Sequence, residues 1–189
     1  EHEFEAAFTK NGAYHNASTS DMNMVYIADC ADFEWERILD LQLLSIAAPK
    51  FNETEFLAEK GNVRNELTGY LNNNARLLWP KIQQAFGEKV LTYEQRLKTI
   101  DNISLSDICE HHTRTHTTDN LRFVIAGKID ESRRDKIIAS LEQISLPRGK
   151  RFDLITDPLE TPHEPVYIAR PDLKNISFGL SLVLPRQLS

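Results

Sequence analysis

Helix-like and strand-like patterns alternate along this chain, and their order limits its fold more than any other feature. Helical spacing of apolar residues predicts helices over residues 3–10, from Asp32 to about Ala48, from Asn52 or Glu53 to Leu78, over 93–100, from Ser104, and over 131–144. Strand patterns cover residues 13–20, 23–30, 121–127, 166–170 and 176–184. Because strands occur both as hairpins and beside helices, we predict an α+β fold with one mixed or antiparallel sheet covered by helices.

The limits of these elements are predicted from local signals. Asp32 and Asp130 stand where a helix N-cap is expected, and Ser104 with Asp107 resembles a weak capping box. Trp79-Pro80 is expected to end the long second helix at Leu78, because proline cannot continue the hydrogen-bond ladder. The strand over residues 23–30 is expected to be buried.

Size and composition exclude several classes of protein. The 189 residues suffice for one buried core, so we predict a single domain over residues 1–189, truncated at both ends. The net charge is −6 and no basic cluster is long enough for a nucleic-acid face, so no nucleic-acid partner is expected. No apolar run approaches the roughly 20 residues that span a bilayer, so no membrane partner is expected either.

Two glutamates on one side of the long second helix are the most informative local feature. Glu59 and Glu66 lie seven residues apart, which places their Cα atoms about 10 Å apart along a helix axis. They run beside an apolar stripe of Phe56, Val63, Leu67 and Tyr70. A buried carboxylate needs a cation, hydrogen-bond donors or a metal. In the simpler alternative both lie at the wet edge of the stripe, paired with Lys60, Arg64 or Arg37.

Three segments, taken together, resemble the insulinase/pitrilysin family of peptidases. Residues 12–20 (Gly-Ala-Tyr-His-Asn-Ala-Ser-Thr-Ser), followed by Tyr26, are similar to its Gly-x-x-x-Asn-Ala-x-Thr segment and next strand. Residues 59–66 (Glu-Lys-Gly-Asn-Val-Arg-Asn-Glu) resemble its Glu-x-x-x-Val-x-x-Glu helix. Residues 118–130 resemble its Asn-strand-Gly-x-Ile-Asp signature. Each match is weak alone, but their order and spacing extend over most of the chain.

The resemblance implies a zinc metallo-endopeptidase that cleaves extended peptides or polypeptides. In that family a helix with H-x-x-E-H supplies two zinc ligands and the Glu that activates the metal-bound water. By the same resemblance Glu66 is the third zinc ligand and Glu59 a supporting residue beside it. Asn16 and Ala17 match the edge strand that holds the substrate by main-chain pairing. A second related domain or subunit is implied as the partner that closes the chamber.

The sequence departs from the family pattern because it contains no H-x-x-E-H. Either the chain is trimmed from an active parent, or the parent is a non-catalytic family member that acts as a structural or peptide-holding subunit. In both cases this fragment is expected to be inactive alone and to lack zinc, since catalytic zinc usually takes three protein ligands. No catalytic residue is therefore predicted within it.

Two other histidine-bearing segments have less specific patterns. Cys109, His112 and His116 are spaced for one helix face and could hold a metal, but a solvated helix end is the preferred interpretation. His15, next to Asn16, could face a substrate, although an exposed strand histidine is the commoner case.

Overall fold

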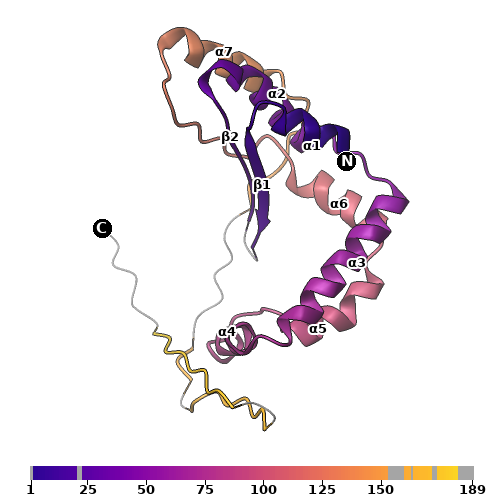
Figure 1. Ribbon diagram of the computed structural model, residues 1–189, viewed down its shortest axis with the longest axis vertical. Coiled ribbons are helices and arrows are strands. Elements are labelled where there is room, and N and C mark those ends of the chain that lie inside the picture. Colours follow the sequence, from indigo (N-terminus) through magenta and orange to yellow (C-terminus); the bar gives the residue numbers. More distant parts are fainter. Residues whose placement is uncertain (1, 21–22, 153–159, 163, 172–173, 183–189) are drawn as a thin grey trace. The chain divides into compact units, whose positions relative to one another are not determined.

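The computed structural model describes residues 2–20, 23–152, 160–162, 164–171 and 174–182. Within them the fold is α+β, as predicted, with α-helices and one two-stranded antiparallel sheet. The elements are α1 (His2–Thr9), β1 (Tyr14–Thr19), β2 (Met24–Asp29), α2 (Trp35–Ala47), α3 (Glu53–Tyr70), α4 (Asn74–Ala85), α5 (Tyr93–Thr99), α6 (Leu105–Thr115) and α7 (Glu131–Glu142), with short 3₁₀ helices η1 (Asp32–Glu34) and η2 (Ile100–Asn102) (Figure 1).

The chain divides into two compact units, and each is described by itself. The first comprises residues 1–51 and 108–154, and the second residues 52–107 and 155–189. The single-domain prediction for residues 1–189 stays a prediction. Among the helices of the described residues, none is both long and apolar enough to cross a bilayer.

The first unit is built around a small apolar core where α1, α2 and the hairpin meet. Phe8, Ala13 and Ile38 are buried together, and Ala28 and Leu41 pack against them. Phe8 is 2% exposed, so the ring is almost entirely removed from water. Burying one aromatic side chain contributes about 1.5–3 kcal/mol, which makes this ring the main apolar anchor of the hairpin.

The β1–β2 hairpin is antiparallel, with Tyr14 opposite Asp29 and Thr19 opposite Met24. Gly12 separates it from α1 with φ +83°, in the left-handed region that glycine adopts without steric cost. The turn begins at Ser20, whose N–H donates to the carbonyl of Asn23 at 2.8 Å, and the rest of the predicted turn lies outside the described residues. The expectation that the second strand is buried is wrong, because most of its side chains are exposed.

Two ion pairs join α7 to the start of α2. Asp32 pairs with Arg133 at 2.6 Å, and Glu36 pairs with Lys136 at 2.6 Å. The prediction that Asp32 caps α2 is therefore wrong, since its carboxylate binds Arg133 and a 3₁₀ turn precedes the helix. Asp130 does cap α7, accepting from the N–H of Arg133 at 2.8 Å.

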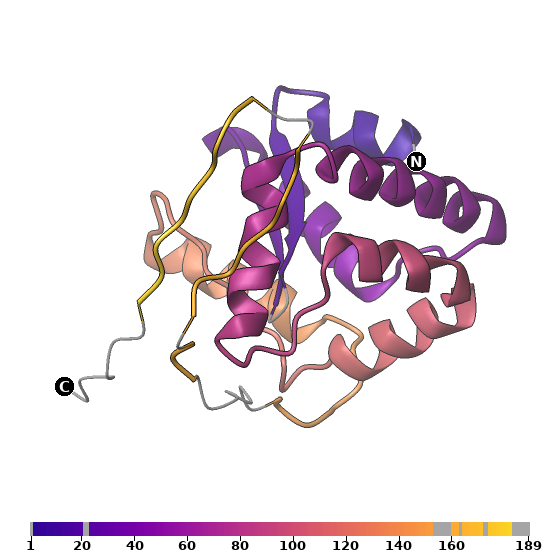
Figure 2. The same ribbon diagram turned by 90° about the horizontal axis from the view of Figure 1, so that it is seen from below.

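In the second unit, α3 and α5 pack against each other and η2 follows α5. Leu67 of α3 and Ile100 of η2 are buried. Extended residues of the 161–181 segment pass beside α4, where Gly179 lies close to Leu78 and Ile82 (Figure 2).

The predicted long helix is in fact two helices. α3 ends at Tyr70 and α4 begins at Asn74, with Asn73 as its N-cap, accepting from the N–H of Arg76 at 3.1 Å. Pro80 lies inside α4 instead of ending a helix. The predicted strands are also absent over 121–127, 166–170 and 176–182, and residues 183–184 lie outside the described residues.

The N-cap of α3 gives a direct test of the local structure that carries both glutamates. The Asn52 side chain accepts from the N–H of Glu55 at 2.8 Å. Replacing Asn52 by alanine leaves this donor without its partner, and we expect a loss of about 1 kcal/mol in the free energy of unfolding, measured by urea titration. Asn52→Ser keeps a capping oxygen and is the control. Equal stability of the alanine and serine variants would contradict the assignment of Asn52 as the N-cap of α3.

Candidate functional site

The helix α3 presents Glu59 and Glu66 on its solvent side. With about 100° between successive residues, the two carboxylates lie about 20° apart around the helix, and the buried Leu67 lies about 100° from Glu66. Both glutamates are exposed, whereas Leu67 is 7% exposed. Both therefore lie at the wet edge of the apolar stripe, as the simpler alternative held.

Each glutamate accepts a hydrogen bond from its own helix. Asn62 donates its side-chain amide to Glu59 Oε1 at 3.3 Å, and the Tyr70 hydroxyl donates to Glu66 Oε1. The Tyr70 ring is itself held, because the Arg76 guanidinium lies 3.9 Å from its centroid and the Tyr93 ring meets it edge-on at 5.1 Å. The donor to Glu66, the Tyr70 hydroxyl, is therefore held in place by its neighbours.

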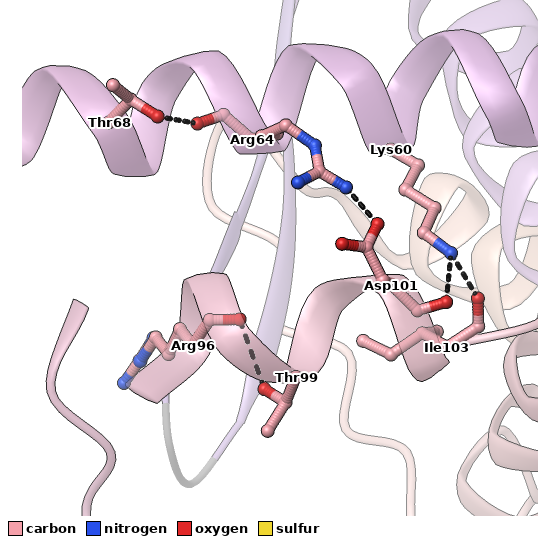
Figure 3. A network of polar contacts seen from close by, with 7 residues as sticks. All are labelled: Lys60, Arg64, Thr68, Arg96, Thr99, Asp101 and Ile103. Atoms are coloured by element: carbon pink, nitrogen blue, oxygen red, sulfur yellow. Dashed lines mark hydrogen bonds and ion pairs between the residues drawn. The ribbon is translucent and has the colours of Figure 1, made fainter. Parts of the chain in front are cut away.

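The cations proposed as partners for the glutamates bind elsewhere. Lys60 Nζ donates to the carbonyl oxygens of Asp101 at 3.0 Å and Ile103 at 2.7 Å, and Arg64 pairs with the Asp101 carboxylate (Figure 3). Arg37, in the first unit, pairs with Glu34, and this contact lowers the pKa of the Glu34 carboxyl. Lys60 and Arg64 therefore join α3 to η2 and fix which side of α3 carries Glu59 and Glu66.

The side chains present do not make a complete zinc site. Glu66 offers one carboxylate, but within the described residues no three His, Cys, Asp or Glu side chains gather to hold a metal ion. A catalytic zinc usually takes three protein ligands, so the donor set here falls short of that requirement.

Asn16 and Ala17 lie on β1 in the first unit, opposite Ile27 and Tyr26. The N–H of Ala17 donates to Asn16 Oδ1 at 2.8 Å, and the Asn16 amide donates to the Tyr14 hydroxyl at 2.8 Å. The Asn16 side chain thus accepts the hydrogen bond of the Ala17 N–H, a backbone donor that a peptide added as a further strand would use. An incoming peptide would have to displace this side chain.

His15 is half-buried on β1, beside the core of the first unit. Its ring stacks on Phe8 with centroids 4.4 Å apart and an interplanar angle of 28°. This contact supports a packing role for His15.

The prediction of a solvated helix end is wrong for His116, the residue that follows α6, although His111 within α6 is exposed. His116 is 6% exposed, and its ring stacks on His112 with centroids 4.0 Å apart. His116 Nε2 is 2.8 Å from the Tyr26 hydroxyl, and His112 Nε2 is 3.0 Å from the carbonyl oxygen of Ile46. The less favoured alternative, a metal held by Cys109, His112 and His116, has no corresponding cluster of ligands in the described residues.

Sequence reasoning missed two partners. Tyr70 was assigned only to the apolar stripe, although its spacing of four residues from Glu66 is the spacing at which helix side chains meet. The pairing of Tyr26 with His116 bridges 90 residues, and no local pattern could indicate it.

Comparison with known proteins gives one match. Residues 1–92 match the family model of insulinase (peptidase family M16), a segment that contains β1, Glu59 and Glu66. Searches of curated proteins and of solved structures found no significant match to this chain. The match over residues 1–92 supports an insulinase/pitrilysin-type fragment.

Proposed function

We propose that this chain is part of a zinc-dependent metallo-endopeptidase, in which Glu66 is one zinc ligand and Glu59 orients the site. The observation that carries the proposal is the insulinase-family match over residues 1–92, which spans both glutamates. The exposed Glu66 carboxylate, with one oxygen bonded by Tyr70, suits a ligand whose orientation is fixed by a neighbour.

The proposal requires groups that these 189 residues do not contain. Two further ligands must come from outside them, because no H-x-x-E-H occurs in the sequence. We also propose an extended peptide or polypeptide as substrate, held at Asn16 and Ala17, and a second related domain or subunit as partner.

The test is the zinc content of the protein in its full natural length, measured by mass spectrometry for the wild type and for Glu66→Gln. We expect about one zinc per chain in the wild type and at least tenfold weaker retention in the variant, since the amide removes an anionic ligand. Glu53→Gln on the same helix is the control and should keep the metal. Full zinc retention by Glu66→Gln would show that Glu66 is not a ligand.

A second candidate function is a non-catalytic subunit that holds a peptide or a partner chain. It needs no H-x-x-E-H, and none occurs in these 189 residues. Zinc in neither the wild type nor the variants would select this function and leave the family assignment unchanged.

A further inference from the structure

A cluster of three ionisable side chains lies where β2 meets α6 in the first unit, away from the two glutamates. Tyr26 comes from β2, His112 comes from the last turn of α6, and His116 is the residue directly after the end of α6 at Thr115. The two histidine rings are nearly parallel, at 18°, and the Tyr26 ring meets His116 edge-on at 6.0 Å. His116 is the buried member, at 6% exposure.

The neighbouring groups assign the protons of these rings. The Thr115 hydroxyl donates to the carbonyl of His111 at 2.7 Å, so toward His116 Nδ1, 3.1 Å away, it can only accept. With Nδ1 of His116 protonated, Nε2 of the neutral ring is an acceptor, and the Tyr26 hydroxyl, which has one proton, donates either to this Nε2 or to Met24 Sδ, each 2.8 Å away. His112 Nε2 faces the carbonyl oxygen of Ile46, which can only accept, so His112 is protonated on Nε2.

The surroundings of His116 disfavour a positive charge. The titratable groups that act on it are Tyr26 from β2 and His112 and His111 from the end of α6, the helix that directly precedes it. Burial lowers the pKa of His116 most and positive charge on His112 lowers it next, the backbone bond to His112 raises it, and positive charge on His111 lowers it least. On the α2 side, a backbone carbonyl and the Phe51 ring contact His112, and neither is ionisable.

We propose that Tyr26, His112 and His116 form an acid-sensitive latch, which holds the β1–β2 hairpin against α6 at neutral pH and weakens when His116 takes up a proton. When His116 takes up a proton, its ring gains an N–H at Nε2, the atom that faces the Tyr26 hydroxyl. The ring then becomes a buried cation stacked on His112. The Tyr26 hydroxyl can turn to donate to Met24 Sδ, 2.8 Å away, so the hydrogen bond can reverse while the cost of the buried charge remains.

The direction of the pH effect follows from the lowered pKa. A histidine whose pKa in the folded state is below its ordinary value of about 6.5 binds its proton more readily when released. The latch is therefore at full strength above about pH 6.5 and weakens as the pH falls from there toward the lowered pKa. Each unit by which the pKa of His116 is lowered corresponds to about a tenfold change in the equilibrium constant between the closed and the open latch.

The latch would control the strand that carries Asn16 and Ala17. Tyr26 lies directly opposite Ala17 in the hairpin register, so weakening its contact with α6 frees the strand that pairs with β1. A consequence for peptide binding rests on the proposed function, whereas the latch itself does not.

The test is an NMR titration of the histidine ring protons of the full chain between pH 8 and 4.5, with amide hydrogen exchange of β2 corrected for intrinsic rates. We expect His116 to titrate below about 6.5, and β2 protection to fall as the pH drops below that value. His112→Gln keeps a donor for the Ile46 carbonyl but removes the imidazole stacked on His116, so the titration midpoint of His116 should move upward. His116→Gln should make β2 protection independent of pH over the same range.

His111→Gln is the matched control on the same helix, because His111 has the smallest effect on His116, and it should leave the profile almost unchanged. The latch is overturned if His116 titrates at or above about 6.5, or if β2 protection in the wild type does not change with pH. Should His116→Gln fail to fold, the shift expected in His112→Gln decides the question. None of these measurements uses zinc or peptidase activity, so the latch can fail without the proposed function failing.

Discussion

Replacing Phe8 by alanine is expected to lower the free energy of unfolding of the chain by about 3–5 kcal/mol. Phe8 is the most buried large side chain of the described residues, and it contacts the Phe4 ring edge-on at 5.2 Å and the His15 ring face-on at 4.4 Å. Truncation leaves a cavity where α1, α2 and the hairpin meet. The loss is a large share of the 5–15 kcal/mol typical of a folded domain, and urea unfolding followed by circular dichroism measures it.

Phe33→Ala is the matched control for this experiment. Its ring is 77% exposed, so the same atoms are removed from a side chain that is largely in water. The change in unfolding free energy should stay within about 0.5 kcal/mol. Similar losses for the two variants would mean that Phe8 does not hold the first unit together.

The 189-residue chain by itself is expected to show no peptide hydrolysis above buffer and to retain far less than one equivalent of zinc. The described residues do not bring three metal ligands together. One carboxylate cannot replace the three protein ligands that catalytic zinc usually has. The measurement is cleavage of a mixture of fluorogenic peptides in the presence of zinc, combined with metal analysis after gel filtration.

The Glu66→Gln variant of the same chain separates this expectation from contamination. Residual cleavage that persists in the variant belongs to a contaminating protease. Cleavage by the purified chain that Glu66→Gln abolishes would contradict the expectation, because it would mean that these residues hold a working site.

Local signals predicted most of the helices and the hairpin. α6 begins at Leu105, and the side chain and backbone N–H of Ser104, just before it, exchange hydrogen bonds with those of Asp107 as a capping box requires. Asp130 caps α7 for the same reason. These caps could be predicted because a cap depends on residues three positions apart in the sequence and needs no distant partner.

The errors come from features that depend on distant residues or on competing signals. Residues 121–127 have a strand composition, but strand structure requires a partner, and Val124 is 93% exposed. Ile176 and Phe178 are likewise 91% and 92% exposed in an extended segment without strand pairing. The split between α3 and α4 did have a local signal in three successive asparagines, residues 72–74, which favour turns and caps.

The candidate site could be predicted only as residue types on one helix. The exposure of Glu59 and Glu66 follows from the helix period once Leu67 is known to be buried. The contacts of Lys60 and Arg64 with Asp101 in η2 could not be predicted from local patterns, because Asp101 lies 41 residues from Lys60 and 37 residues from Arg64 in the sequence.

The division of the first unit into two stretches of sequence has a consequence for synthesis on the ribosome. Its ion pairs Asp32–Arg133 and Glu36–Lys136 connect residues about one hundred positions apart, with residues 52–107 of the second unit between them. During translation, α1, α2 and the hairpin emerge long before α7 exists to bind them. At about 5–20 residues per second, they wait on the order of five to twenty seconds with that surface uncovered. The α3–α5 contact, by contrast, joins neighbouring stretches that leave the ribosome in quick succession.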